Sequence, residues 1–416
     1  MFSFSAVSEN SGITILASHV RAQLSRLEPP HRIAGVDLAR GLAVIGVFAA
    51  HLAVITPLEW GDPGTWSGVV EGRSAVLFAM LAGVSLGIVA AASRRRCAGG
   101  AVGPVGAEGA VGAEGTVGAA GVPVRTMPLW GLRTQLLLRG ILLWLLGVWL
   151  DDLDVPVYVI LPAYGALFVL AIPFTSLAPR HLFALSATLA VGAPFVVWWI
   201  NIAVSRSDDP VSVEESLRLI AWNYPLPLWL AFMLCGMATG SLLMRSWRYA
   251  WPLLGIGAVL ALLGYGVIGP AALGDGEVTA ARALSPGSTE WWRFALSDAP
   301  HSSGVGEALG SGGFALAATC AAVLLCVTPL RWIALPLRAV GSMPLTAYVA
   351  HIGIWAAWIA VETARDPDMN PSLGFQALDP FWPTTVGMLL GCTIWALLAG
   401  QGPLEWLLGK LTKAPR

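Results

Sequence analysis

The chain has few charged residues. Asp, Glu, Lys and Arg make up 12% of its 416 residues, whereas hydrophobic residues make up 56%. Soluble globular domains usually contain about 25% charged residues, so this composition excludes an ordinary soluble protein. The 24 basic and 25 acidic residues nearly cancel, to a formal net charge of −1, and we expect no nucleic acid among the partners of the chain.

Cysteine is also scarce, and the short motifs of well-known soluble enzymes are missing. The chain has five cysteines. No two of them form a CxxC pair and four lie within apolar runs, so we expect neither a disulfide framework nor a metal site. The sequence shows no P-loop, dinucleotide-binding motif or soluble catalytic triad motif.

Long hydrophobic runs dominate the sequence instead. Ten segments are each near 20 residues long, about the length that an α-helix needs to cross a bilayer, and polar, glycine- or proline-containing turns separate them. The sequence therefore predicts an all-α, polytopic integral membrane protein with about ten transmembrane helices, in a domain that covers residues 32–403. The expected helices cover residues 33–56, 73–92, 131–150, 157–177, 182–203, 225–244, 250–270, 309–330, 343–362 and 382–402.

The basic residues predict the orientation of these helices, because Arg and Lys collect on the cytoplasmic side of membrane proteins. With the N-terminus inside, all basic residues but six fall on that side, and the acidic run 151–154 falls outside. We therefore expect a multi-pass protein of the plasma membrane with a cytoplasmic N-terminal segment (residues 1–31) and a cytoplasmic tail (residues 404–416). The six exceptions are Arg73, Arg206, Arg218, Arg282, Arg293 and Arg365.

Two long connecting segments have different character. Residues 93–128 contain repeated VGAEG-like units without apolar periodicity, which predicts a flexible Gly- and Ala-rich cytoplasmic loop. Residues 271–308 form the longest outer loop. The Gly-rich run 310–313 lies at the expected start of the next helix, where free backbone N–H groups could bind an anion.

Three polar residues interrupt the first predicted helix. Asp37 and Arg40 are three residues apart, so they share a helix face and can form an ion pair. His51 lies eleven residues after Arg40, which is about 16 Å along the helix axis. Ionisable residues in a membrane helix are costly unless they meet a partner or a water-filled cavity, so this helix is the first candidate for a functional site.

Histidines are the strongest candidates for catalysis. His51 and His351 each lie within a predicted membrane helix, and His301 lies at the outer mouth of another. A neutral histidine in a membrane can also serve structure alone by bonding a backbone carbonyl or a hydroxyl, and this interpretation stays open for each of them. The catalytic candidates are His51, His301 and His351.

Polar residues near these histidines are candidates for binding a substrate or cofactor. Arg73 could pair with Glu71 or Asp62, bind an anionic group, or reach the membrane interface. Tyr348 precedes His351 by three residues and shares its helix face. The candidate binding residues are Asp37, Arg40, Glu71, Arg73, Tyr164, Ser302, Glu307 and Tyr348.

A histidine in a membrane cavity with acidic residues nearby suits more than one function. It can act as a general base or nucleophile in acyl transfer. It suits a proton-coupled transporter of a small solute nearly as well, although the chain has no clear internal repeat of the kind common in such transporters. A structural or sensory membrane protein is the third alternative.

The first helix resembles the opening motif of a family of bacterial membrane proteins. Residues 32–51, RIAGVDLARGLAVIGVFAAH, are similar to the pattern Arg-x-x-Gly-x-Asp-x-x-Arg-Gly followed by an apolar helix that ends in His or Asn. The pattern is that of proteins related to heparan-alpha-glucosaminide N-acetyltransferase and to the YeiB-type proteins. Residues 72–87, 298–317 and 341–354 resemble further hallmarks of the bacterial members. The matching motif positions are Arg32, Gly35, Asp37, Arg40, Gly41 and His51.

The resemblance implies a transmembrane acyltransferase. An acyl group, with acetyl-CoA as the first expected donor, would pass from a cytoplasmic CoA thioester to an amine or hydroxyl on the outer face. The acceptor would be a sugar, a wall polymer or a lipid-linked molecule. The expected partners are the lipid bilayer, a small-molecule or glycan acceptor and a second copy of the chain in a homodimer, and no metal is expected.

The sequence departs from the family at the proposed catalytic histidine. The eukaryotic relative carries that histidine in the outer loop after the first helix, in a segment that ends Ser-Trp-Asn-Gly. The corresponding residues here are 65–68 (TWSG), and Pro63 stands in the place of the histidine. We therefore expect His51 to be the general base, with His301 second and His351 a helper or a structural contact.

The expected chemistry follows from this assignment. His51 would remove a proton from the acceptor as the acceptor attacks the thioester. Arg73, or backbone N–H groups near Gly310, would stabilise the developing oxyanion.

Overall fold

The computed structural model describes residues 32–56, 58, 61–99, 129–207, 217, 223–273, 291–366 and 374–413. Every regular element in these ranges is a helix. Three expected segments lie wholly or partly outside them, namely the N-terminal segment 1–31, most of the loop 93–128, and the part between residues 273 and 291 of the loop expected on the outer side.

Nine helices of the described chain are long and apolar enough to cross a membrane. The prediction of an all-α, polytopic membrane protein is thereby confirmed, and every expected span except 157–177 corresponds to one of these helices. They are α2 (Ala34–Leu52), α3 (Arg73–Gly99), α4 (Leu129–Asp151), α6 (Pro179–Ser205), α8 (Leu226–Leu243), α9 (Ala250–Leu263) with its continuations η4 (Gly264–Ile268) and α10 (Gly269–Leu273), α13 (Val305–Val327), α15 (Pro344–Arg365) and α17 (Phe381–Leu398).

The span expected at residues 157–177 is not one long helix. α5 (Leu161–Leu170) has 10 residues, about 15 Å, and a separate 3-10 helix, η2 (Ile172–Ser176), follows it. Proline explains these boundaries, because it has no backbone N–H and is favoured in the first turn of a helix. Pro162 stands at the start of α5 and Pro173 at the start of η2. The residues just before α5 are therefore not helical.

Short helices lie between and after the long ones. α14 (Leu335–Ser342) precedes α15, and α18 (Pro403–Leu411) occupies most of the expected C-terminal tail. Glu405 of α18 accepts hydrogen bonds from the backbone N–H groups of Leu345 and Thr346 at 2.7 and 3.1 Å, so it caps the start of α15. The remaining short elements are η1 (Pro63–Val70), η3 (Trp247–Tyr249), α12 (Trp291–Leu296), η5 (Pro329–Trp332) and α16 (Gly374–Ala377).

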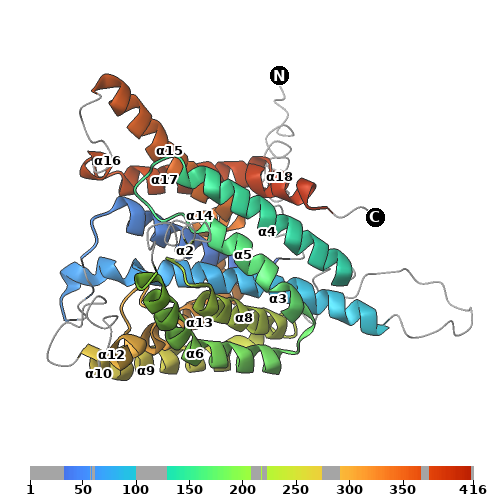
Figure 1. The fold of residues 1–416 in the computed structure, drawn as a ribbon. Coiled ribbons are helices and arrows are strands. Elements are labelled where there is room, and N and C mark those ends of the chain that lie inside the picture. Colours follow the sequence, from blue (N-terminus) through green and yellow to red (C-terminus); the bar gives the residue numbers. More distant parts are fainter. Residues whose placement is uncertain are drawn as a thin grey trace, which may run out of the picture.

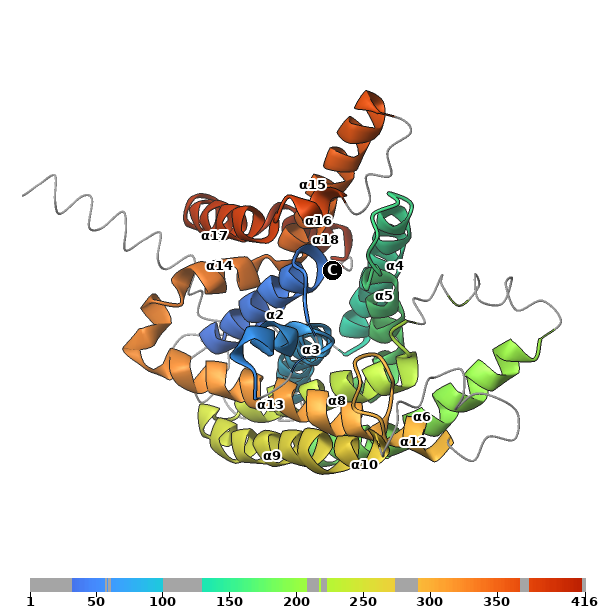
Figure 2. The same ribbon diagram turned by 90° about the vertical axis from the view of Figure 1, so that its left-hand side faces the viewer.

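The long helices form an inner and an outer set (Figure 1 and Figure 2). α2, α3, α8 and α13 are more than half buried, and α2 packs against α3, α13, α14 and α15. α4, α6, α15, α17 and the helix over residues 247–272 are less than a third buried and carry many exposed Leu, Ile, Val and Trp side chains. These exposed faces suit contact with lipid, whose tails are as apolar as the side chains.

Glycines bring α3 and α8 into direct backbone contact. Gly83 and Gly87 of α3 are four residues apart, and so are Gly236 and Gly240 of α8. A Cβ atom at Gly83 would lie 2.0 Å from the carbonyl oxygen of Met233. Small residues at this spacing let two membrane helices approach closely, as the sequence of α3 indicates.

We expect Gly83→Val to destabilise the protein by about 1–3 kcal/mol or more, because the new side chain would overlap the backbone of α8. Gly353→Val in α15 is the matched control, since a Cβ at Gly353 would have no atom within 4 Å. The measurement is the free energy of unfolding in mixed detergent micelles during titration with sodium dodecyl sulfate. Equal losses in the two variants would contradict the close packing of α3 and α8.

Candidate functional site

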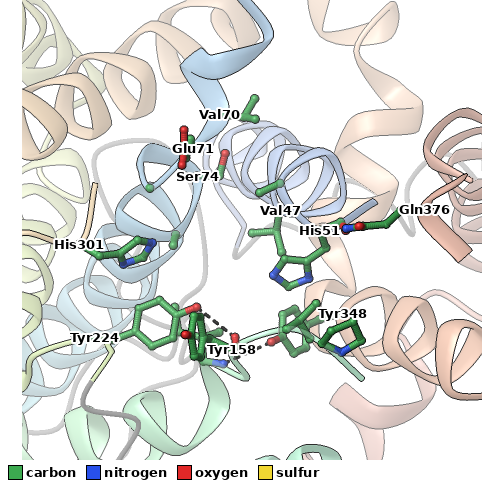
Figure 3. A pocket seen from close by; sticks show the side chains of 16 residues that line it. Val47, His51, Val70, Glu71, Ser74, Tyr158, Tyr224, His301, Tyr348 and Gln376 are labelled. Atoms are coloured by element: carbon green, nitrogen blue, oxygen red, sulfur yellow. Dashed lines mark hydrogen bonds between the residues drawn. The ribbon is translucent and has the colours of Figure 1, made fainter. Parts of the chain in front are cut away.

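A cavity of about 240 Å³ lies where the end of α2 meets the start of α3, the residues before α5 and part of α15 (Figure 3). Four of the residues that the sequence singled out line it: His51, Glu71, His301 and Tyr348. Its other lining residues come from segments far apart in the chain. They are Val47, Ala50, Val70, Gly72, Ser74, Ala75, Pro156, Val157, Tyr158, Ile160, Tyr224 and Gln376.

Two histidines from distant helices meet at one wall of this cavity. Nδ1 of His51 and Nε2 of His351 lie 3.0 Å apart, so one nitrogen donates a hydrogen bond to the other. The two rings stack, with their centroids 5.2 Å apart and 30° between their planes. His51 lines the cavity, whereas His351 is 1% exposed and lies behind it. The two predicted membrane histidines are therefore direct partners.

Neighbouring side chains fix the positions of both histidines. His51 lies in the last turn of α2, where backbone carbonyls have no partner within the helix, and Gln376 Nε2 donates to the carbonyl of His51 at 2.8 Å. Tyr348 and His351 lie three residues apart on α15, and their rings meet edge-on at 5.1 Å. The ring of Phe48 also contacts His351, at 4.7 Å between centroids. His351 is thus held by aromatic rings from two helices.

His301 and Tyr224 lie on the opposite side of the cavity from His51 (Figure 3). Their rings meet edge-on at 5.4 Å, and the Tyr224 hydroxyl donates to the carbonyl of Tyr158 at 3.0 Å. The crowded surroundings lower the pKa of His301, because a poorly hydrated site disfavours the imidazolium, while a hydrogen bond to the backbone of Asn223 acts in the opposite direction. The residue as a whole is nevertheless exposed.

Arg73 lies outside this cavity, although Glu71 and Gly72 line it. Its guanidinium lies 4.4 Å from the centroid of the Tyr265 ring and donates to the carbonyl of Gly68 at 3.2 Å. The side chain is buried in these contacts. The expectation that Arg73 stabilises an oxyanion beside His51 therefore does not fit its position.

The Gly-rich run 310–313 does not open a helix, contrary to the expectation. α13 begins at Val305, so the run lies inside the helix, where its backbone N–H groups bond to carbonyls of the preceding turn. The glycines serve close packing instead. A Cβ at Gly313 would lie 2.4 Å from the backbone nitrogen of Ala261 in α9. The proposed anion site near Gly310 is therefore wrong.

Ser302 and Tyr164 lie near the cavity without lining it. The Ser302 hydroxyl donates to the carbonyl of Ser297 at 3.4 Å, and the Tyr164 hydroxyl donates to the carbonyl of Ala75 at 3.4 Å. Glu307 is buried in the first turn of α13 and binds the backbone of the preceding turn. All three side chains hold the backbone that surrounds the cavity.

Asp37 and Arg40 form the predicted ion pair at the opposite end of α2 from the cavity. Their Oδ1 and Nη1 atoms lie 2.7 Å apart, and Arg32 Nε lies 3.4 Å from the other carboxylate oxygen of Asp37. Arg40 also donates to the hydroxyl of Ser85 at 2.5 Å, and Arg32 donates to the carbonyl of Ser342 at 3.1 Å. One carboxylate thus lies between two guanidinium groups, and these in turn bind α3 and α14.

No family model, curated protein or solved structure matches the chain. Among the residues that the structure describes, no group of three or more His, Cys, Asp and Glu side chains is placed to hold a metal ion.

Sequence patterns do not single out several residues that line the cavity, namely Ser74, Tyr158, Tyr224 and Gln376. The scarcity of tyrosine was the one signal in the sequence. The chain has six tyrosines, and three of them line the cavity. Gln376 leaves no such signal. It bonds to a carbonyl 325 residues earlier in the chain, and no local pattern reports a contact of that kind.

Proposed function

We propose that the chain is a membrane acyltransferase. It passes an acyl group, acetyl in the simplest case, from cytoplasmic acyl-CoA to an amine or hydroxyl of an acceptor that reaches the cavity from the outer face. The observation that carries the proposal is the hydrogen-bonded pair of His51 and His351 at the cavity wall. The likeness of residues 32–51 to the motif of an acyltransferase family supports the same chemistry.

The hydrogen bond between the histidines defines their roles. Nδ1 of His51 is engaged by His351, which leaves Nε2 of His51 available to the cavity. For Nε2 to accept a proton, Nδ1 must carry the hydrogen of the neutral ring and donate it to Nε2 of His351. His351 then fixes the tautomer and orientation of His51, as the aspartate does in a Ser-His-Asp triad. It also stabilises the positive charge that His51 acquires.

The reaction balances with these two residues alone. The acceptor gives its N–H or O–H proton to His51 Nε2 while its lone pair attacks the carbonyl carbon of the thioester. The tetrahedral intermediate then collapses, the C–S bond breaks, and the CoA sulfur takes the proton from His51. The acyl group leaves on the acceptor, and His51 is neutral again.

Tyr348 is well placed to stabilise the oxyanion of the intermediate. Its hydroxyl oxygen accepts a hydrogen bond from the backbone N–H of Ile160 at 3.3 Å, so its own hydrogen is left to donate. Tyr348 lines the cavity, and its ring contacts that of His351. A donor to a developing oxyanion typically contributes about 10²–10³-fold in rate. Tyr348 thus takes the role first expected of Arg73.

Arg32 and Arg40 supply positive charge for the phosphates of acyl-CoA at the far end of α2. Their side chains are 28% and 17% exposed, so part of each guanidinium is open to a ligand. Asp37 offsets only one of the two charges. Arginine suits phosphate because its planar guanidinium donates two parallel hydrogen bonds.

Binding of radiolabelled acetyl-CoA to the purified protein in detergent tests this proposal. We expect saturable binding that unlabelled CoA displaces and acetate does not. Arg32→Ala should weaken binding about tenfold, since it removes a charge-assisted contact. Arg180→Ala, on the exposed start of α6, is the control and should leave the affinity unchanged. Absence of saturable binding to the folded protein would contradict the proposal.

Proton-coupled transport of a small solute is the second candidate, and the same hydrogen bond favours it, because two histidines in contact can pass a proton. Transport predicts solute flux that follows a pH gradient across proteoliposomes and needs no CoA. A pH-sensitive dye trapped in the vesicles measures the accompanying proton movement. Acyl transfer predicts no proton movement in the absence of acyl-CoA.

A further inference from the structure

We propose that Glu307 is a positioning residue that holds His301 in the cavity, across from His51. His301 lies in the turn before α13, and Glu307 lies in the first turn of that helix. The proposal deepens the proposed function, because His301 faces the same substrate space. The geometry behind it is nevertheless independent of acyl transfer.

Both carboxylate oxygens of Glu307 bind the turn. Oε1 accepts a hydrogen bond from the backbone N–H of His301 at 2.8 Å, and Oε2 accepts one from the backbone N–H of Ser303 at 2.7 Å. Glu307 is 2% exposed, so water does not compete for these bonds. One side chain thus restrains the backbone at two residues and sets the direction in which the His301 ring projects.

The backbone of this turn requires a restraint. His301 and Ser303 have φ values of +61° and +57°, in the left-handed region that residues with a Cβ seldom adopt. Glycine would adopt this region without strain, but neither position is glycine. Such conformations persist only where surrounding contacts enforce them. The two hydrogen bonds to Glu307 are contacts of this kind.

Arg73 follows Gly72, the residue on which Pro300 of the turn packs. Arg73 is itself held by the ring of Tyr265 and the carbonyl of Gly68. Tyr265 lies in the π-helix η4, and its hydroxyl is 2.7 Å from that of Ser311. The start of α3, beside the turn, is therefore fixed by contacts of its own.

The restrained turn forms part of the cavity wall. The His301 ring packs edge-on against Tyr224 and lines the cavity. Pro300, the preceding residue, packs on Gly72, where a Cβ would lie 2.9 Å from the Pro300 Cβ. If Glu307 released the turn, the His301 ring would leave Tyr224, and the remote histidine pair on α2 and α15 would keep its geometry.

Glu307→Gln tests the proposal, because it keeps the size of the side chain but replaces one acceptor oxygen with an NH₂ group that cannot accept. The readout is the rate at which diethyl pyrocarbonate modifies His301 in the purified full-length protein, measured by mass spectrometry. His301 is already exposed, so we expect a rise of at most about tenfold, as its ring loses the contact with Tyr224. Tenfold is the factor that corresponds to one lost charge-assisted hydrogen bond. His181, on the exposed start of α6, should react at an unchanged rate.

Ser303→Gly supplies a rescue that general destabilisation would not show. Glycine adopts the left-handed region readily, so the double variant Glu307→Gln/Ser303→Gly should return the His301 modification rate most of the way to the wild-type value. Ser303 does not line the cavity, and its replacement removes no cavity contact. An unchanged His301 rate in folded Glu307→Gln protein would overturn the proposal, and so would a double variant without rescue.

If Glu307→Gln does not fold, Glu307→Asp tests whether Glu307 positions His301. The aspartate keeps the charge but is one methylene shorter, so it cannot reach both N–H groups. Faster modification of His301 in this variant supports the proposal, and an unchanged rate overturns it. Because the modification does not require acyl transfer, its failure is distinguishable from failure of the proposed function.

Discussion

Replacement of His51 by alanine is expected to lower the rate of acyl transfer by about 10²–10⁴-fold, the range typical of a lost general base. The substitution removes the nitrogen that faces the cavity, and His351 is 1% exposed behind it and cannot take its place. The KM for acetyl-CoA should change little, because the proposed phosphate contacts lie at the other end of α2. The measurement is kcat and KM with purified protein in detergent.

Two substitutions of His351 separate tautomer control from packing. His351→Gln offers a carbonyl oxygen that can accept the hydrogen of His51 Nδ1, whereas His351→Leu leaves that hydrogen without an acceptor. We therefore expect a smaller loss of rate in His351→Gln than in His351→Leu. His181→Ala, on the exposed start of α6, is the control and should keep the full rate. A folded His51→Ala protein with the wild-type rate would exclude His51 as the base.

Replacement of Asp37 by alanine is expected to lower the free energy of unfolding by about 3–5 kcal/mol, the usual cost of removing one partner of a buried ion pair. The Asp37 side chain is 5% exposed and lies against the guanidinium groups of Arg40 and Arg32. Without it, the two neighbouring guanidinium groups would repel each other. Unfolding in mixed detergent micelles during titration with sodium dodecyl sulfate measures the loss.

The chain contains a matched control for this ion pair. Arg365 and Glu362 are also three residues apart on a helix and also 2.7 Å apart, but the Arg365 side chain is 71% exposed. We expect Glu362→Ala to cost about 1 kcal/mol or less, because solvent screens an exposed pair. Similar losses in Asp37→Ala and Glu362→Ala would show that burial does not set the contribution of the pair near Arg40.

Features that depend on local sequence could be predicted. The helices follow from apolar runs of membrane-spanning length, and the ends of α15 differ from the prediction by only one and three residues. Asp37 and Arg40 meet because residues three apart share a helix face. The same rule places Tyr348 beside His351.

Features that depend on distant contacts or on proline could not be predicted in the same way. His51 and His351 are 300 residues apart, and no spacing rule indicates that they touch. Across residues 157–177 the apolar composition predicts one helix, but Pro162 and Pro173 divide it. α13 begins before its apolar run, because backbone hydrogen bonding rather than hydropathy determines where a helix starts.

Release of CoA from acetyl-CoA by the purified protein, with water as the acceptor, is the most direct test of acyl transfer that depends on His51. A thiol-reactive dye follows the reaction in detergent. We expect slow, saturable release by the wild-type protein, at least about 10²-fold slower release by His51→Ala, and unchanged release by His181→Ala. Equal rates in wild-type and His51→Ala protein, or no release by a folded wild-type sample, would contradict a role of His51 in acyl transfer.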